Sequence, residues 1–152
     1  MSKTPAYFMA LALDEARAAA AADEVPVGAV VVRRGEILAR AQNRVERDRD
    51  PTAHAEILAI RAACRITGEK RLPDASLYVT LEPCAMCAQA IALAHLEGLV
   101  FAAYDPKGGG VDHGARVFDQ TTCHHRPRLV GGLLEEEARE LLKNFFRGLR
   151  ST

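Results

Sequence analysis

The chain has 152 residues, enough for one domain with a hydrophobic core and too few for a second domain. Its formal net charge is zero, so the bulk charge argues against a nucleic-acid partner, because such proteins usually carry a basic excess. No apolar run approaches the roughly 18 residues needed to span a bilayer. Acidic residues interrupt the apolar N-terminal stretch, which argues against a signal peptide. We therefore expect one domain spanning residues 1–152, located in the cytoplasm, with no membrane partner.

The first third of the chain predicts a helix followed by a hairpin. Thr4 can cap a helix that starts at Pro5, and apolar residues recur at helical spacing to about Ala21. The apolar runs Val27–Val32 and Ile37–Ala41 predict two strands. Arg34-Gly35 between them is typical of a tight hairpin turn. The charged segment that follows, from Arg44 to Arg49, is expected to be a loop.

The remainder of the chain predicts helices and strands in alternation. A helix capped by Thr52 and ended by Gly68 comes first, followed by a strand from Ser76 to Leu81 and a helix that has Pro83 in its first turn and runs to about His95. A strand from Leu99 to Ala103 precedes a segment without clear period from Asp105 to Pro127. The chain closes with a short strand from Leu129 to Gly131 and an amphipathic helix from Leu133 to Leu149. This order predicts an α/β fold, in which a mixed five-stranded sheet lies between helices on both faces as a three-layer α/β/α sandwich.

Two separated segments carry residues suited to a metal site. "PTAHAE" contains His54 and Glu56, and "EPCAMC" contains Cys84 and Cys87. Zinc binds imidazole nitrogen and thiolate sulfur in tetrahedral geometry, and a catalytic zinc keeps its fourth position open for water. His54, Cys84 and Cys87 supply three ligands, which leaves Glu56 free to move protons. We expect two helix N-termini to converge here, because their dipoles favour thiolates.

Other interpretations of the cysteines remain open at this point. Cys84 and Cys87 could belong to a structural zinc site, a redox pair or the core. A structural site requires a fourth protein ligand, and the cluster Cys123-His124-His125 offers candidates. That cluster could also bind a second metal, or be a polar surface loop. Cys64, on an apolar helix face, is expected in the core.

The signature H-x-E…P-C-x-x-C is that of zinc nucleobase deaminases. The chain resembles the bacterial tRNA-specific adenosine deaminases of the cytidine and deoxycytidylate deaminase superfamily over nearly its whole length. The matching segments are "EVPVGAVVV", Asn43, "DPTAHAE", "LYVTLEPCAMCAQA", "YDPKGGG" and "NFFRGLR". The resemblance implies the cytidine-deaminase-like fold, one Zn²⁺ per subunit, a homodimer, and a tRNA anticodon stem-loop as partner. It further implies hydrolytic deamination of adenosine to inosine at the wobble position.

The resemblance also implies roles for individual residues. Glu56 would be the catalytic acid and base. The substrate-binding residues that it implies are Val27, Asn43, Leu81, Asp105, Lys107, Phe145, Phe146 and Arg147. From the sequence alone, Asn43 could equally be a turn residue, and at least one of the two phenylalanines could face the core. The segment from Val111 to Arg128 departs from the family's pattern, so substrate contacts there are not assigned.

Two other functions compete with this interpretation. The same chemistry could act on free cytosine, guanine or their nucleosides, which an assay with an anticodon stem-loop against free bases would distinguish. Alternatively, the chain could be a non-catalytic, zinc-stabilised RNA-binding module. Four protein ligands on the zinc would favour that module, and an open coordination position would argue against it.

Overall fold

A mixed five-stranded sheet forms the centre of the molecule, here described by a computed structural model that covers residues 3–150. The strand order is β2-β1-β3-β4-β5. The strands are β1 (Gly28–Arg33), β2 (Glu36–Gln42), β3 (Ala75–Leu81), β4 (Gly98–Ala103) and β5 (Arg128–Gly131). β1 is antiparallel to both of its neighbours, whereas β3, β4 and β5 run parallel. The carboxyl ends of β3 and β4 therefore meet at one edge of the sheet.

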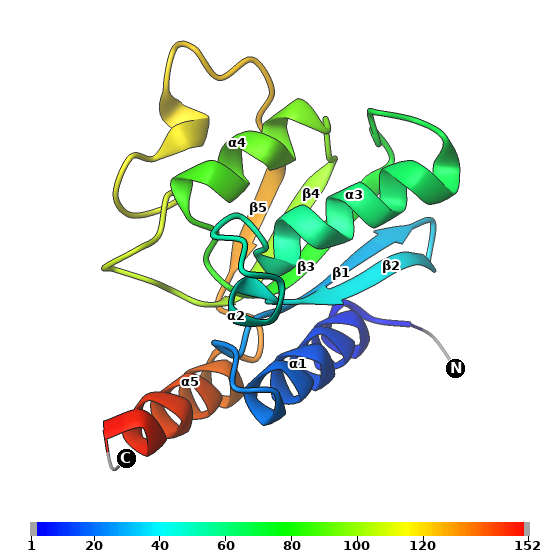
Figure 1. Cartoon of the computed structure of the whole chain (residues 1–152). Helices are drawn as coiled ribbons and strands as arrows, with labels where there is room; N and C mark the ends of the chain where they lie inside the picture. Colours follow the sequence, from blue (N-terminus) through cyan, green and yellow to red (C-terminus); the bar gives the residue numbers. More distant parts are fainter. Residues whose placement is uncertain (1–2, 151–152) are drawn as a thin grey trace.

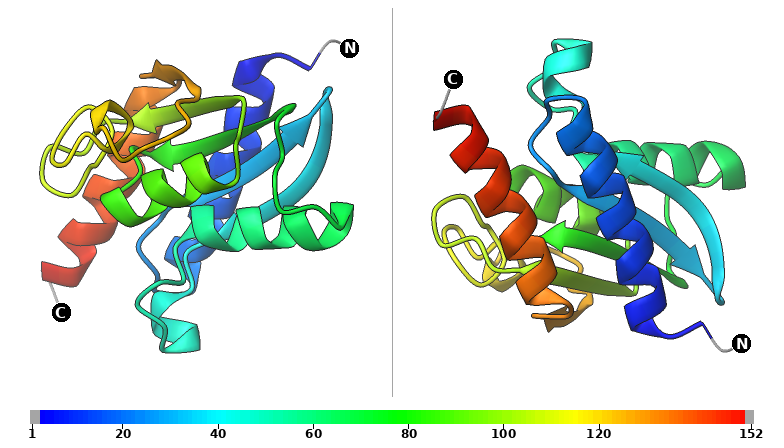
Figure 2. Two further views of the ribbon diagram at one scale, coloured as in Figure 1. Left: turned by 90° about the horizontal axis from the view of Figure 1, so that it is seen from above. Right: turned by 90° about the horizontal axis from the view of Figure 1, so that it is seen from below.

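Helices cover both faces of this sheet, which confirms the predicted α/β/α sandwich. They are α1 (Pro5–Ala21), α2 (Val45–Asp48), α3 (Ala55–Thr67), α4 (Ala85–Leu93) and α5 (Glu135–Arg150), with a short 3₁₀ turn η1 (Val117–Asp119). α3 and α4 lie on one face, and α1 and α5 lie side by side on the other (Figures 1 and 2). Within residues 3–150, none of these helices is long and apolar enough to cross a membrane.

Alternating side chains on the central strands build a separate core on each face. In β1, Ala29 and Val31 pack in the cluster that contains residues of α3 and α4, and Val30 and Val32 pack in the cluster that contains residues of α1. Successive side chains of a strand point to opposite faces, so a strand buried on both sides is apolar throughout. This explains why the sequence of β1 is a continuous apolar run rather than an alternating pattern.

Several helix and turn signals in the sequence act as predicted. The hydroxyl of Thr4 accepts a hydrogen bond from the Tyr7 N–H and caps α1. Gly68 ends α3 in the left-handed conformation, with a φ of 72°. Arg34 and Gly35, with φ values of 51° and 79°, form the turn between β1 and β2.

The start of α3 differs from the prediction. The helix begins at Ala55 with His54 as its N-cap, and not at Thr52. The Thr52 hydroxyl donates to Asp50 Oδ1 at 2.7 Å, and the Thr52 N–H donates to the same oxygen at 2.8 Å. Asp50 thus forms a local turn around Pro51. The Thr52 hydroxyl is bonded within this turn and does not cap the helix. The consequence is that His54 stands at the very end of the helix.

Four other details of the secondary structure also differ. α4 starts at Ala85 with Cys84 as its N-cap, so Pro83 precedes the helix instead of lying in its first turn. The same helix ends at Leu93, because His95 takes a left-handed φ of 53°. The segment expected to be a loop between Arg44 and Arg49 contains the single turn α2. At the end of the chain, α5 starts at Glu135 rather than Leu133.

We predict that Gly28→Ala lowers the free energy of unfolding by about 1–3 kcal/mol, a typical result of overpacking. A Cβ atom at this position would overlap the backbone oxygen of Ala12 and lie 2.6 Å from the backbone nitrogen of Ala16, so α1 could not stay against β1. Chemical denaturation measures the change. Gly148→Ala in α5 is the matched control, because a Cβ there meets nothing within 4 Å. Equal unfolding midpoints for Gly28→Ala and the wild type would contradict the prediction.

Candidate metal centre and adjoining pocket

The N-termini of α3 and α4 bring three potential metal ligands together. His54 is the N-cap of α3, Cys84 is the N-cap of α4, and Cys87 lies in the first turn of α4. Neither N-cap side chain makes a capping hydrogen bond, so both are free to turn toward each other. His54 Nδ1 lies 3.6 Å from Cys84 Sγ and 3.5 Å from Cys87 Sγ. All three ligand atoms lie within 4.8 Å of one another, as the sequence predicted.

The two cysteines share a proton unequally. A hydrogen bond from the Cys87 thiol, together with the His54 ring, lowers the pKa of Cys84 to about 4, although burial opposes this effect. The same hydrogen bond raises the pKa of Cys87. Hydrogen bonding to Cys84 also raises the pKa of His54. A divalent cation replaces such protons readily, because thiolate and neutral imidazole are its ligands.

The donor set fits zinc. One imidazole nitrogen and two thiolate sulfurs are ligands typical of zinc, and three protein ligands leave one position of a tetrahedron open. Within residues 3–150, no other cluster of His, Cys, Asp or Glu places three ligand atoms so close. In the second cluster considered above, the Cys123 thiol donates to the backbone oxygen of His125, and the His125 ring bonds to the Leu96 carbonyl. Cys64 packs against the core, as expected.

Glu56 lies beside the three ligands in the first turn of α3. This residue is only 4% exposed. Burial raises the pKa of Glu56 to about 7, against the opposing effect of the nearby His54 ring. A carboxyl group whose pKa is close to neutral can both accept and return a proton, which is what general acid–base catalysis requires.

A pocket of about 750 Å³ opens directly onto this centre. Its wall contains His54, Glu56 and Cys84, together with five of the predicted substrate-binding residues. These five are Val27, Asn43, Leu81, Asp105 and Phe145. A neighbouring pocket of about 890 Å³ shares Val25, Leu81, Asp105, Gly108 and Leu149 with the first. The remaining three predicted residues, Lys107, Phe146 and Arg147, line this second pocket.

Asn43 connects the pocket wall to the metal centre. Its side-chain oxygen accepts a hydrogen bond from the Ala55 N–H at 2.8 Å, so it satisfies a donor at the start of α3 that His54 leaves free. Its backbone N–H donates to Val27 at 3.1 Å. Since the amide oxygen is used in this way, the amide NH₂ is the group that Asn43 can offer to the pocket.

The loop after β4 forms the side of the pocket across from Asn43. Two residues that hold this loop, Glu82 and His113, were not identified from the sequence. Glu82 is 1% exposed, and its carboxylate accepts N–H bonds from Asp105, Val111, Asp112 and His113 at 2.9 to 3.2 Å. The His113 ring lies 2.8 Å from the same carboxylate. Burial raises the pKa of Glu82, but these hydrogen bonds lower it by more, and the pKa falls below its usual value. The carboxylate therefore ties the loop after β4 to the strand that precedes Cys84.

The sequence contained a signal for one of these residues. An acidic side chain at the end of an apolar strand, as Glu82 is, requires a buried partner. No signal pointed to His113, because it lies in the segment without period and becomes a neighbour of Glu82 only through the fold.

Fold and site together define a class, that of zinc-dependent deaminases in which a buried glutamate stands beside three metal ligands. Residues 2–103 match the family described as the cytidine and deoxycytidylate deaminase zinc-binding region. The chain is 55% identical to the tRNA-specific adenosine deaminase of Agrobacterium fabrum over 144 residues, which cover 95% of each chain.

Two solved structures show the same fold. One comes from a study of A-to-I editing by tRNA:A34 deaminases at the wobble position of transfer RNA. It has a TM-score of 0.88 and 55% identity and covers 90% of this chain and 99% of its own. A guanine deaminase from Nitrosomonas europaea has a TM-score of 0.82 at 28% identity and covers 93% of this chain and 84% of its own. The chain belongs to the tRNA-specific adenosine deaminase family, with the cytidine-deaminase-like fold and the zinc cofactor of that family.

We predict that His54→Ala, Cys84→Ser and Cys87→Ser each abolish binding of zinc, because a site with two protein ligands holds the ion far more weakly. Purified chains should change from one zinc per chain to nearly none, measured by elemental analysis. Cys123→Ser is the matched control and should keep the full content, since its thiol bonds to a backbone carbonyl. Zinc retained by the Cys87→Ser variant would show that the site is assigned wrongly.

We predict that Glu82→Gln lowers the free energy of unfolding by about 1–3 kcal/mol, because the new NH₂ group faces N–H donors in place of an acceptor. Urea denaturation of the zinc-loaded chain measures the change. Glu97→Gln serves as control, since Glu97 is half-exposed and pairs with Arg128 at the surface. If both variants unfolded at the same midpoint, Glu82 would not hold the loop.

Proposed function

We propose that this protein deaminates adenosine to inosine at the wobble position of a tRNA anticodon. The observation that carries the proposal is the pocket above His54, Cys84 and Cys87, with the buried Glu56 in its wall and a second pocket beside it. One pocket accommodates a single base, and the other accommodates its neighbours in the same strand. A base inside a stack cannot reach such a centre, so the target must be extruded, which an anticodon loop allows at low energetic cost.

Glu56 is the proposed catalytic acid and base. Zinc at this site supplies Lewis-acid chemistry that lowers the pKa of a water toward about 7. Glu56 accepts a proton as the water oxygen attacks the purine carbon that carries the amine. It donates this proton to the adjacent ring nitrogen. It then accepts the proton of the new hydroxyl group and donates it to the departing amine, as the carbonyl of inosine forms. One water is consumed and one ammonia leaves, so the carboxylate returns to its starting state.

The other proposed site residues orient the base. The NH₂ group of Asn43 donates to a ring nitrogen acceptor, since the amide oxygen is already bonded to Ala55. Val27 and Leu81 provide apolar walls for the faces of the purine. Both are held by the sheet, because Leu81 ends β3 and Val27 directly precedes β1. The base is therefore held against a rigid layer rather than against a loop.

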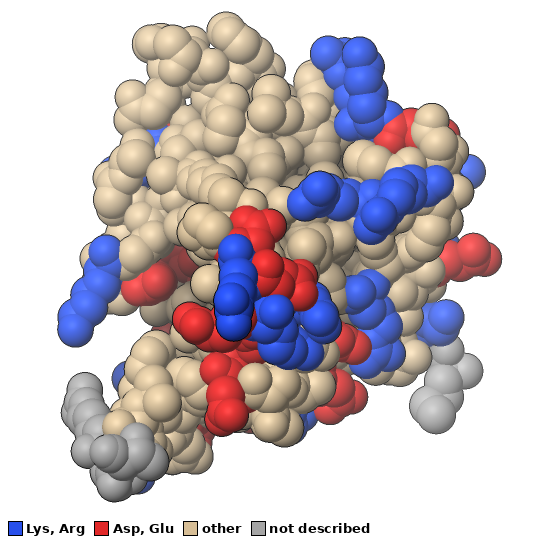
Figure 3. Space-filling model, viewed as in Figure 1, with Lys and Arg blue, Asp and Glu red and all other residues tan. Residues whose placement is uncertain are grey.

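Residues around the second pocket, together with Phe145 in the wall of the first, are the proposed contacts to the flanking nucleotides. Lys107 and Arg147 provide positive charge for phosphates, and Phe145 and Phe146 provide rings on which a base can stack. Asp105 fixes the loop by accepting N–H bonds from Lys107 and Gly108. The face shown in Figure 3 carries mixed charges, with acidic and basic side chains together around α2. Contacts to RNA are thus expected to be local, in agreement with a net charge of zero.

The active form is proposed to be a cytoplasmic homodimer in which each chain is a single deaminase domain. The outer sides of α3 and α4 present exposed apolar side chains: Leu93 is 66% exposed, and Ile66 and Met86 are also exposed. A shallow hollow between the two helices is lined by Ile60, Ala90, Leu93 and Ala94, together with the basic residues Lys70 and Arg71. Because α3 and α4 carry the metal ligands, pairing through this side would place a second chain near the pocket.

A second candidate is deamination of a free base, since the guanine deaminase of Nitrosomonas europaea shares the fold. The decisive assay compares an anticodon stem-loop carrying adenosine with free adenine, adenosine, guanine and cytosine. Inosine formed only in the stem-loop supports the proposal. Ammonia released only from the small molecules would overturn it. A non-catalytic RNA-binding module would release ammonia from none of them while still binding the stem-loop.

We predict that Glu56→Gln retains one zinc but lowers turnover of the stem-loop by about 10²–10⁴-fold, because the amide cannot move protons. Single-turnover conversion to inosine, together with zinc content, measures both properties. Glu69→Gln, an exposed position after the end of α3, should behave as wild type. Near-normal turnover by the zinc-loaded Glu56→Gln variant would remove Glu56 from the mechanism.

We predict that Leu93→Arg converts the dimer to a monomer, since the added positive charge would be buried in the interface beside Lys70 and Arg71, without an acidic partner in the hollow. Light scattering after size-exclusion chromatography gives the mass in solution. Leu149→Arg, at an exposed apolar residue of α5, is the control and should stay dimeric. A wild-type chain that is monomeric at micromolar concentration would refute the dimer.

A further inference from the structure

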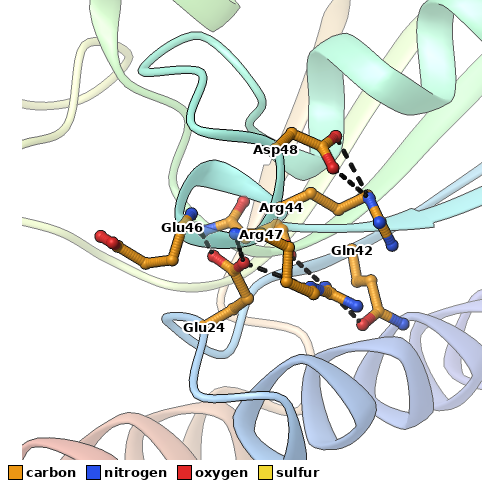
Figure 4. A network of polar contacts seen from close by, with 7 residues as sticks. Glu24, Gln42, Arg44, Glu46, Arg47 and Asp48 are labelled. Atoms are coloured by element: carbon orange, nitrogen blue, oxygen red, sulfur yellow. Dashed lines mark hydrogen bonds and ion pairs between the residues drawn. The ribbon is translucent and has the colours of Figure 1, made fainter.

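A buried carboxylate stands in the wall of the pocket and takes no part in the proposed chemistry. Glu24, in the connection between α1 and β1, is 1% exposed. Its Oε1 accepts the Glu46 N–H at 3.1 Å, and its Oε2 accepts the Arg47 N–H at 2.8 Å (Figure 4). Oε2 also pairs with Arg47 Nε at 3.2 Å. The Glu24 carboxylate thus binds two backbone N–H groups of α2 and also the side chain of Arg47.

Arg47 extends this arrangement to the base-binding residue. The Arg47 guanidinium bonds not only to Glu24 but also to residues earlier in the chain. Its Nη2 donates to Gln42 Oε1 at 2.9 Å (Figure 4). The same Nη2 donates to the backbone carbonyl of Asn43 at 2.7 Å. The planar guanidinium can satisfy these three acceptors at once, whereas a lysine ammonium cannot match the same directions.

Asn43 is consequently held at each of its backbone polar groups and at its side-chain oxygen. Its N–H bonds to Val27, its carbonyl accepts from Arg47, and its Oδ1 accepts from Ala55. The Val27 and Ala55 bonds fix it to the sheet and to α3. The Arg47 bond is the one that connects it to the buried carboxylate.

We propose that the Glu24–Arg47 pair is a positioning unit that sets the direction of the Asn43 amide, and thereby the fit of the purine in the pocket. The proposal rests on the proposed function. Within residues 3–150, the side-chain hydrogen bonds of Glu24 and Arg47 join them to each other and to Gln42, Asn43 and Glu46, and none goes to a metal ligand. Asn43 is therefore the residue through which the pair acts on the base. Removing the Arg47 side chain should weaken productive placement of the base, while zinc content and folding persist.

Arg47→Met is the informative variant because it leaves Glu24 bonded to two backbone N–H groups, so no buried charge loses all its donors. The neighbouring pair Arg44–Asp48 supplies the matched control. Arg44 Nε lies 3.1 Å from Asp48 Oδ1, the pair is exposed, and the Arg44 side chain makes no bond to Asn43. Arg44→Met therefore removes the same charge one turn away without disturbing the unit.

The test is a double-mutant cycle on kcat/KM for the adenosine stem-loop, with Arg47→Met and Asn43→Ala alone and combined. Arg47→Met should lower kcat/KM by about 10- to 100-fold, as misplacement of a substrate does. In the Asn43→Ala background the further loss should be less than about twofold. Arg47→Lys should not restore the activity, and Arg44→Met should match the wild type. Equal losses in both backgrounds, or equal activity of Arg47→Met and Arg44→Met, would overturn the proposal.

Hydrogen exchange provides a readout that does not depend on turnover. The Ala55 N–H is bonded to Asn43 Oδ1, so its exchange should accelerate in Arg47→Met and not in Arg44→Met. Unchanged exchange at Ala55 would overturn the positioning role. If the wild type failed to deaminate the stem-loop, the proposed function would fall, while the exchange rates would still decide whether Arg47 fixes Asn43.

Discussion

The convergence of two helix N-termini on one point is the constraint on which the rest of the site depends. His54 begins α3 and Cys84 begins α4, and β3 lies between these helices in the chain. Because the β3–α4–β4 unit is parallel, Cys84 emerges at the carboxyl edge of the sheet. α3 packs across the same face and brings His54 to that edge. Both N-cap side chains are spared from capping, so they can bind a cation in a field that favours thiolates.

Two buried glutamates hold the two sides of the pocket in the same manner. The Glu24 carboxylate accepts hydrogen bonds from backbone N–H groups of α2. The Glu82 carboxylate accepts them from N–H groups of the loop from Asp105 to His113. In each case burial alone would raise the pKa of the carboxyl, and the hydrogen bonds lower it more, so the pKa lies below its usual value. A carboxylate that accepts several N–H bonds can rigidify irregular backbone that has no strand or helix partner. The pocket therefore has defined walls even where its secondary structure is sparse.

The sequence predicted the layers, the strands and the metal ligands, because these depend on local patterns: apolar runs, a hairpin turn, and the two short motifs H-x-E and P-C-x-x-C. It failed where a competing local bond decided the outcome. Thr52 was expected to cap α3, but its hydroxyl donates a hydrogen bond to Asp50, and the N-cap of α3 is His54. The Glu82–His113 contact joins residues 31 apart through the fold, so no local pattern could reveal it.

We expect a bound zinc to keep one coordination position free of protein, because among residues 3–150 only His54, Cys84 and Cys87 place their ligand atoms so close together. The coordination shell of the zinc shows whether a fourth protein ligand is present. X-ray absorption at the zinc edge of the purified chain should show two sulfurs at about 2.3 Å, one imidazole nitrogen at about 2.0 Å, and one light atom from solvent. Addition of a nucleoside that mimics the hydrated purine should change the light atom and leave the sulfurs in place. A shell of four protein ligands, or one with a third sulfur, would contradict the account.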